Sequence, residues 1–387
     1  MKIIHTSDWH IGREFENESL QAEQSSFLSW LTEQIKIHAV DLVVVAGDIY
    51  DKAMPKGEAV TLLDRGLDSI RSAGAEILLI SGNHDNAARL NFGAQRQRSS
   101  GVYIYAQDES YPTPFLYEKN GQKVGFVAIP FLDPQRAPQP MPKESGESRP
   151  RTHQTVLEDA IFKAREQMQG FGDAPTICVA HAYVQGSEIS ESERHSVGNA
   201  DLVEASIFDG FTYTALGHLH RPQVIPGHEA VAYSGSPLPY SFSEDHAKSV
   251  RLIELQPDGT LVFETLSIPV GRPVIVLTDS FDKLLNDPKY AKYENYWVSA
   301  KLADEGVIEE PMTRLRTRFP HIAALAYADV RRSGAEGPLE GAGVVDNQTP
   351  MEVILDFIND LQGRDPYPFE IELAQSGINR LIKEDGE

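Results

Sequence analysis

The segment Ile3-Ile4-His5-Thr6-Ser7-Asp8-Trp9-His10 places two metal-binding side chains directly after a short apolar run. An apolar run of this kind is typical of a buried β-strand, and Asp8 and His10 follow where that strand ends. The arrangement returns twice, with Leu42-Val43-Val44-Val45 before Gly47-Asp48 and Ile77-Leu78-Leu79-Ile80 before Gly82-Asn83-His84-Asp85. The pattern predicts buried strands whose carboxyl ends carry polar chemistry.

Helical patterns separate these strands. Apolar residues recur at helical spacing over residues 27–35 and again over residues 62–70. Strand, helix, strand, helix, strand indicates an α/β protein with βαβ units. Further strands are predicted at Val124–Ile129, Thr176–Ala180, Thr212–Leu216, Ala230–Tyr233, Val250–Leu255 and Leu261–Leu266. Two sheets packed back to back, with helices outside, would accommodate this many strands.

The length of 387 residues exceeds what one hydrophobic core usually serves, so at least two domains are expected. The pattern changes near residues 269–273, and a Gly-rich stretch at 334–343 is typical of a linker. Apolar faces at helical spacing predict helices over residues 351–361 and 371–382. We expect a core domain at 1–268, a small domain at 269–334 and C-terminal helices within 344–387.

Composition limits the classes of function. The net charge of −22 disfavours a protein that binds nucleic acid tightly by its own electrostatics, although it does not disfavour phosphate chemistry. The single cysteine, Cys178, excludes an internal disulfide and a thiolate metal cage. No signal peptide or spanning helix is recognisable, so we expect a soluble, cytoplasmic protein without a membrane partner.

Two later segments, His181 and Gly217-His218-Leu219-His220, also follow strand-like runs. Because the carboxyl ends of strands in an α/β sheet gather at one edge, we expect these side chains to converge. The candidate metal ligands are Asp8, His10, Asp48, Asn83, His181, His218 and His220. Carboxylates, an amide and imidazoles suit Mn²⁺, Fe²⁺ or Zn²⁺ better than Mg²⁺ or Ca²⁺. Seven ligands are about right for two ions that share a bridging carboxylate.

Each of these fragments alone is as typical of a turn as of a metal site, but all five in this order resemble the signature of calcineurin-like metallophosphoesterases. More narrowly, His5–Gly12, Gly47–Asp51 and Tyr233-Ser234-Gly235-Ser236-Pro237 resemble the SbcD nuclease subunits of bacteria. The resemblance implies a two-sheet metallophosphoesterase sandwich flanked by helices and a small α+β capping domain. It also implies C-terminal helices that dock on an SbcC-type ATPase.

The resemblance also implies roles for individual residues. Asp8, His10 and His220 would hold one ion, and Asn83, His181 and His218 the other. Asp48 would bridge the two ions, most often Mn²⁺ in this family. His84 would be the catalytic residue that meets the scissile phosphate. Apart from the resemblance, we expect Asp85 to orient His84, because it is the next residue in the same loop.

The activity implied is DNA end processing: 3′→5′ exonuclease action on duplex ends and endonuclease action on single strands or hairpins. The partners implied are DNA, the ATPase and a second copy of the chain, paired through helices between residues 21 and 72, within a heterotetramer. The alternative is a small-molecule phosphodiesterase or phosphoprotein phosphatase. Phosphoprotein phosphatases continue Gly-Asp-X-X-Asp with Arg-Gly, whereas here Lys52-Ala53 follows Asp51. A vestigial scaffold is disfavoured because every ligand position is filled.

Overall fold

The computed structural model of the protein describes residues 1–106, 114–142, 145–193, 202–256, 258–304, 306, 308–328, 349, 351–352, 354–355 and 366–384. The chain forms two compact units, Met1–Asp329 and Val330–Glu387, which are described separately. Within the described ranges, no helix is both long enough and apolar enough to cross a membrane.

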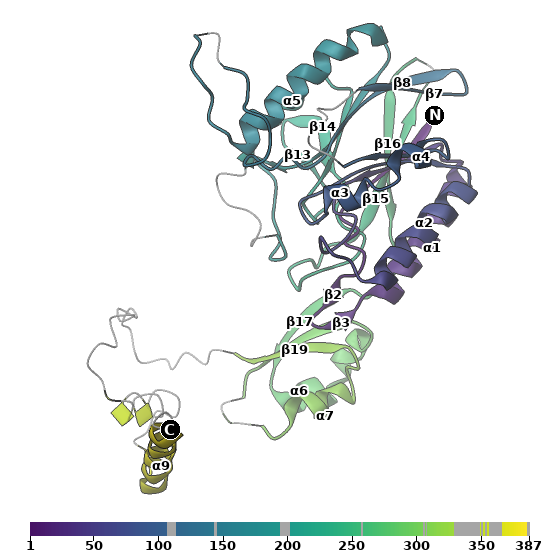
Figure 1. Cartoon of the computed structure of the whole chain (residues 1–387). Helices are drawn as coiled ribbons and strands as arrows, with labels where there is room; N and C mark the ends of the chain where they lie inside the picture. Colours follow the sequence, from purple (N-terminus) through teal and green to yellow (C-terminus); the bar gives the residue numbers. More distant parts are fainter. Residues whose placement is uncertain are drawn as a thin grey trace. The chain divides into compact units, whose positions relative to one another are not determined.

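The first unit contains two six-stranded sheets, which Figure 1 shows among their helices. The first sheet has the order β16 (Leu261–Ser267), β15 (Ser249–Leu255), β1 (Lys2–Thr6), β4 (Leu42–Ala46), β5 (Glu76–Ile80) and β6 (Val102–Tyr105). Strands β1, β4, β5 and β6 are parallel, so their carboxyl ends meet at one edge.

The second sheet has the order β13 (Gln223–Ile225), β14 (His228–Tyr233), β12 (Tyr213–Gly217), β9 (Thr176–His181), β8 (Gln122–Ile129) and β7 (Phe115–Lys119). Its four central strands, β14, β12, β9 and β8, are parallel. The carboxyl ends of β9 and β12 are therefore neighbours at one edge of this sheet.

Three apolar cores hold these layers together. Residues from both sheets, such as Val44 and Val179, form the core between the sheets. The outer face of the first sheet packs on α1 (Gln21–His38) and α2 (Gly57–Ser72), which lie side by side in Figure 1. The outer face of the second sheet packs on α5 (His153–Met168). The predicted α/β fold, a two-sheet sandwich flanked by helices, is confirmed.

A third, three-stranded parallel sheet lies between residues 274 and 327, with β17 (Val274–Asp279), β18 (Trp297–Leu302) and β19 (Ile322–Tyr327). It has its own core with α6 (Phe281–Asn286), the 3-10 helix Pro288–Tyr293 and α7 (Pro311–Arg316). A smaller cluster, in which Trp297 contacts Phe15, joins this sheet to the loops of the sandwich. We keep the boundary at residue 269 as a proposal.

Short elements complete the first unit. They are the hairpin β2 (Glu14–Phe15) and β3 (Glu18–Ser19), the pair β10 (Tyr183–Val184) and β11 (Leu202–Val203), α3 (Ala87–Leu90), α4 (Ala94–Arg98), and the 3-10 helices Gln169–Phe171 and Ala205–Phe208.

In the second unit, α9 (Pro368–Glu384) contains the predicted helix at 371–382. Residues 351, 352, 354 and 355 are helical, while most of the predicted helix at 351–361 and all of the predicted linker at 334–343 lie outside the described residues.

Candidate metal centre

The candidate ligands lie at the carboxyl ends of five parallel strands: β1, β4 and β5 in the first sheet, and β9 and β12 in the second, with His181 as the last residue of β9 and the others on the loops that follow. Main-chain hydrogen bonds join the first two loops, because Asp8 N–H donates to Gly47 O at 3.0 Å and His10 N–H donates to Asp48 O at 2.9 Å. Across the sandwich, His218 N–H donates to Asp8 Oδ1 at 2.9 Å. The loops of both sheets therefore form one connected edge.

Backbone strain is concentrated at this edge. Four of the candidate ligands have positive φ angles although none is glycine: Asp8 (52°), His10 (42°), Asp48 (49°) and His218 (110°). Non-glycine residues rarely adopt this region, which costs about 1–3 kcal/mol at each position. Strain of this kind persists where the surrounding structure fixes it, and it gathers at functional sites.

Glycines that precede the ligands allow the loops to approach closely. A Cβ atom on Gly82 would lie 2.1 Å from Asp48 Oδ1, and one on Gly217 would lie 1.8 Å from Ala46 O. Both contacts are shorter than any side chain tolerates. The glycine of Gly-Asn-His is thus explained by packing between neighbouring loops of the first sheet, and the glycine of Gly-His-X-His by packing between the two sheets, as well as by ligand chemistry.

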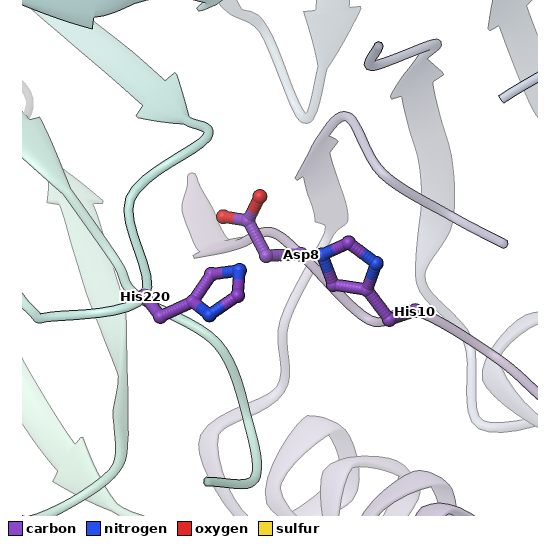
Figure 2. Close-up of side chains that lie close together, drawn as sticks. All are labelled: Asp8, His10 and His220. Atoms are coloured by element: carbon purple, nitrogen blue, oxygen red, sulfur yellow. The ribbon is translucent and has the colours of Figure 1, made fainter. Parts of the chain in front are cut away.

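The first cluster, called site one, consists of Asp8, His10 and His220. One ligand atom from each lies within 4.8 Å of the others, and all three residues are buried. Figure 2 shows Asp8 and His10 on one loop, with His220 facing them from another. Among the described residues, both ring nitrogens of His10 are buried without a hydrogen-bond partner. An orphaned imidazole beside a carboxylate and a second imidazole fits a divalent cation.

The second cluster, called site two, consists of Asn83, His181 and His218. His181 Nε2 lies 3.0 Å from Asn83 Oδ1, and His218 Nδ1 lies 3.1 Å from the same oxygen. His181 Nδ1 is 2.9 Å from Ala46 O, and this contact directs Nε2 towards Asn83. Two imidazoles and an amide oxygen therefore converge on one point.

Asp48 lies between the two sites. Its Oδ2 atom is 3.5 Å from His10 Nε2 in site one and 3.5 Å from His181 Nε2 in site two. Its Oδ1 atom accepts a hydrogen bond of 2.9 Å from His84 N–H. The structure therefore brings all seven predicted side chains together, with the carboxylate of Asp48 in the position required of a shared ligand.

Burial and neighbouring charges shift the pKa values of this cluster in the protein without a cation. Burial lowers the pKa of His10 and of His218 to about 3, and burial raises the pKa of Asp8 to about 6. For His181, burial alone would lower the pKa, but the charge of Asp48 outweighs it and raises the pKa to about 9. Removing these groups from water has a cost that a bound cation would offset.

His84 lies beside site one and forms a further cluster with His10 and Asp48, whose ligand atoms lie within 4.8 Å of one another. Its Nδ1 is 2.9 Å from the carbonyl oxygen of Asp51, and its ring centroid is 4.7 Å from that of His10. The expectation that Asp85 orients His84 is wrong. Asp85 instead accepts hydrogen bonds of 2.9–3.0 Å from the N–H groups of Gly82, Ile49 and Tyr50, and so holds the loops after β4 and β5 together.

Sequence reasoning missed the side chains behind the histidines. Asp51 Oδ1 lies 3.5 Å from His10 Nδ1 and accepts a hydrogen bond of 2.9 Å from Arg13 Nη1. Glu244 Oε1 lies 3.1 Å from His220 Nδ1. Asp51 stands in the Gly47–Asp51 motif, whereas Glu244 carries no local signal that connects it to His220.

Comparisons with known protein families agree with this geometry. Residues 1–222 match the calcineurin-like phosphoesterase family, and residues 270–361 match the SbcD C-terminal family, described as the type 5 capsule protein repressor C-terminal domain. Two solved structures give weaker matches. A Thermus thermophilus protein, TT1561, has 12% identity, a TM-score of 0.37, and coverage of 68% of this chain and 98% of its own. A dimetal phosphatase from Danio rerio has 11% identity, a TM-score of 0.39, and coverage of 69% and 98%.

The match over residues 1–222 covers more than half of the chain and indicates a metal-dependent phosphoester hydrolase. The clustered histidines and aspartates indicate divalent-metal binding. The match at 270–361 agrees with the resemblance to SbcD nuclease subunits. The chain belongs to the calcineurin-like phosphoesterase family.

Proposed function

We propose that this protein is the nuclease subunit of an SbcCD-type complex and hydrolyses DNA phosphodiesters with two divalent cations, for which we propose Mn²⁺. The observation that carries the proposal is the convergence of seven ligand side chains in a chain that also matches the SbcD C-terminal family. Asp8, His10 and His220 would hold one cation, Asn83, His181 and His218 would hold the other, and Asp48 would be shared.

Bound cations would supply a water of lowered pKa and would offset charge on the phosphoryl oxygens. Hydrolysis requires that a water lose a proton to solvent as its oxygen bonds to phosphorus, that the bond from phosphorus to the 3′ oxygen break, and that this oxygen take up a proton. His84 is the proton donor in this proposal. Because Nδ1 faces the carbonyl oxygen of Asp51, Nε2 is the ring nitrogen free to meet the leaving oxygen.

The proposed substrate face lies beside His84. A hollow there is lined by Arg13, Asp51, Lys52 and His84. Arg13 is held by Asp51 and lies 4.8 Å from the ring centroid of Tyr240, so its charge is fixed close to the proposed reacting phosphate. With a net charge of −22, the chain needs a partner for most of its DNA affinity.

We propose an SbcC-type ATPase as that partner. In α9, Phe369 and Leu373 are exposed and stand one helical turn apart, as expected of a helix that docks on another protein. The match at residues 270–361 supports the same context, with 269–334 as the capping domain and 344–387 as the docking region. We further propose a homodimer through α1 and α2 within a heterotetramer, and a cytoplasmic location beside the DNA.

The proposed activities are 3′→5′ exonuclease action on duplex ends and endonuclease action on single strands or hairpins. The alternative, a small-molecule phosphodiesterase or phosphoprotein phosphatase, has the same metal chemistry. The sequence Asp51-Lys52-Ala53 lacks the Arg-Gly continuation of the phosphoprotein phosphatases, which favours the nuclease.

The test offers the purified chain three substrates in the presence of Mn²⁺: an end-labelled duplex, a hairpin and a phosphopeptide. A His84→Gln variant serves as the control for contaminating nucleases. We expect cleavage of the duplex and hairpin, stimulated by the ATPase partner and lost in the variant. Cleavage of the phosphopeptide alone would support the alternative and overturn the proposal.

A further inference from the structure

A buried polar network lies behind His220, on the side of the ring away from site one. His220 Nδ1 is 3.1 Å from Glu244 Oε1 and 2.9 Å from Ser192 Oγ. The hydroxyl of Ser192 donates to the same Glu244 oxygen at 2.7 Å. Because Glu244 is only 1% exposed, water does not compete for this carboxylate.

The other oxygen of Glu244 is fixed by Lys248, which also donates to the carbonyl oxygen of His220 at 3.2 Å. Lys248 Nζ donates to Glu244 Oε2 at 2.6 Å and also to Ser236 Oγ at 2.8 Å. Both members of this ion pair are buried. A buried ion pair is weak evidence for stability, because desolvation opposes the attraction between its charges. Stability alone therefore does not explain why this ion pair is buried behind His220.

A separate carboxylate fixes the main chain at the same residue. Glu193 accepts a hydrogen bond from His220 N–H, and Glu193 is also buried. The backbone of His220 is thus held by Glu193 and Lys248. Glu244 is the carboxylate nearest to the ring nitrogen Nδ1, at 3.1 Å against 3.7 Å for Glu193, so its specific effect is on the orientation and tautomer of the imidazole.

We propose that Glu244 is the positioning residue of site one: it accepts the Nδ1 hydrogen of His220, so that Nε2 presents its lone pair to the cation. This inference rests on the proposed function, in which His220 is a ligand. A carboxylate behind a metal-binding imidazole fixes its tautomer and raises its basicity. In site two, the carbonyl oxygen of Ala46 stands in the corresponding place behind His181.

The test measures Mn²⁺ binding to the full chain by equilibrium dialysis, with electron paramagnetic resonance to distinguish coupled from isolated ions. The variants are Glu244→Ala, which removes the acceptor, and Glu244→Gln, which keeps the shape and loses the charge. The control is Asp159→Asn, because Asp159 is also buried and also pairs with a lysine four residues later, Lys163, on α5.

We expect one of the two binding steps to weaken by about 10-fold in Glu244→Gln and about 100-fold in Glu244→Ala, the range for partners of metal ligands. The other step stays unchanged, and the coupled resonance is replaced by that of isolated Mn²⁺. Asp159→Asn binds both ions as the wild type does.

Three outcomes would count against these ideas in different ways. Two unchanged binding steps in Glu244→Gln overturn the positioning role, and so does equal weakening of both steps in a folded variant. If Glu244→Ala does not fold, the metal binding of Glu244→Gln alone decides whether Glu244 has the positioning role. If the wild type binds no Mn²⁺, the proposed function itself fails, whatever the variants do.

Discussion

Site one and site two use the same kinds of ligand but are held in place differently. Behind site one stand side-chain carboxylates, with Asp51 beside His10 and Glu244 beside His220. Behind site two stands the main chain, because His181 is fixed by the carbonyl oxygen of Ala46 at the end of β4. Site one can therefore be changed by single substitutions behind its ligands, whereas the geometry of site two is a property of the fold.

The largest effect is expected from Asp48→Asn, which removes the charge between the two sites. Asp48 Oδ2 is equally distant from the nearest nitrogens of His10 and His181, so both cations lose their shared ligand. We expect hydrolysis to fall to background and metal content to fall at both sites, measured by metal analysis after gel filtration. Retention of one ion at full affinity would show that Asp48 belongs to a single site.

The next largest effect is expected from His84→Gln, which lies outside both ligand sets. Loss of a proton donor costs about 10²–10⁴-fold in rate. Metal content should stay at the wild-type level, because the His84 ring contacts the carbonyl oxygen of Asp51 and is not a ligand in the proposed division of roles. If hydrolysis and metal content fall together, His84 is a ligand and the division of roles is wrong.

Acid should remove the cations from both sites. A proton and a metal ion compete for each imidazole, so affinity rises with pH and falls as pH drops. In site two, protons compete with the cation up to the highest pH, because the pKa of His181 is raised to about 9 without a cation. We expect metal binding near pH 7 to release protons, measured by calorimetry in buffers of different ionisation enthalpy. Because the pKa of His181 is raised to about 9, protons already compete with the cation below that value, and we expect hydrolysis to fall as the pH drops from 9 towards 5.

Hydrolysis retained at pH 5 with metal present would contradict the histidine ligand sets. Retained hydrolysis would also mean that the two sites do not differ in their sensitivity to protons, since neither would then depend on a neutral imidazole.

The smallest effect is expected from Asp51→Asn. Asp51 lies 3.5 Å from His10 Nδ1 and is shared with Arg13, so its hold on the imidazole is weaker than that of Glu244 on His220. We expect about a 10-fold loss of metal affinity at site one, the lower end for such partners. Asp279→Asn, in the third sheet, is the control. If Asp51→Asn instead lost metal affinity only at site two, Asp51 would support site two and the stated difference between the sites would be wrong.

Much of the fold was predictable because its strands are unusually apolar. Leu42–Ala46 is buried along its whole length, and such runs are typical of parallel strands covered on both faces. The ligands could be predicted for the same reason, since parallel strands bring their carboxyl ends to one edge. The assignment of those ligands to two ions came from the resemblance to a known family, because the spacing of the residues along the sequence does not show which ligands share an ion.

The rest was not predictable because it depends on contacts between distant residues. Glu244 and His220 are 24 positions apart on irregular segments, and Glu193 and His220 are 27 apart. Neither pair has a periodic pattern. Helix α5 begins after a Pro-rich stretch and has a modest apolar stripe, so it was missed although Thr152 caps it. The role given to Asp85 failed because a residue next to His84 in sequence faces the backbone of another loop.

The most direct test of the account is anomalous scattering from crystals of the protein grown with Mn²⁺. We expect two peaks, one among Asp8, His10 and His220 and one among Asn83, His181 and His218, with a carboxylate oxygen of Asp48 coordinated to each. A single peak, or two peaks with Asp48 bound to neither, would contradict the two-cation centre.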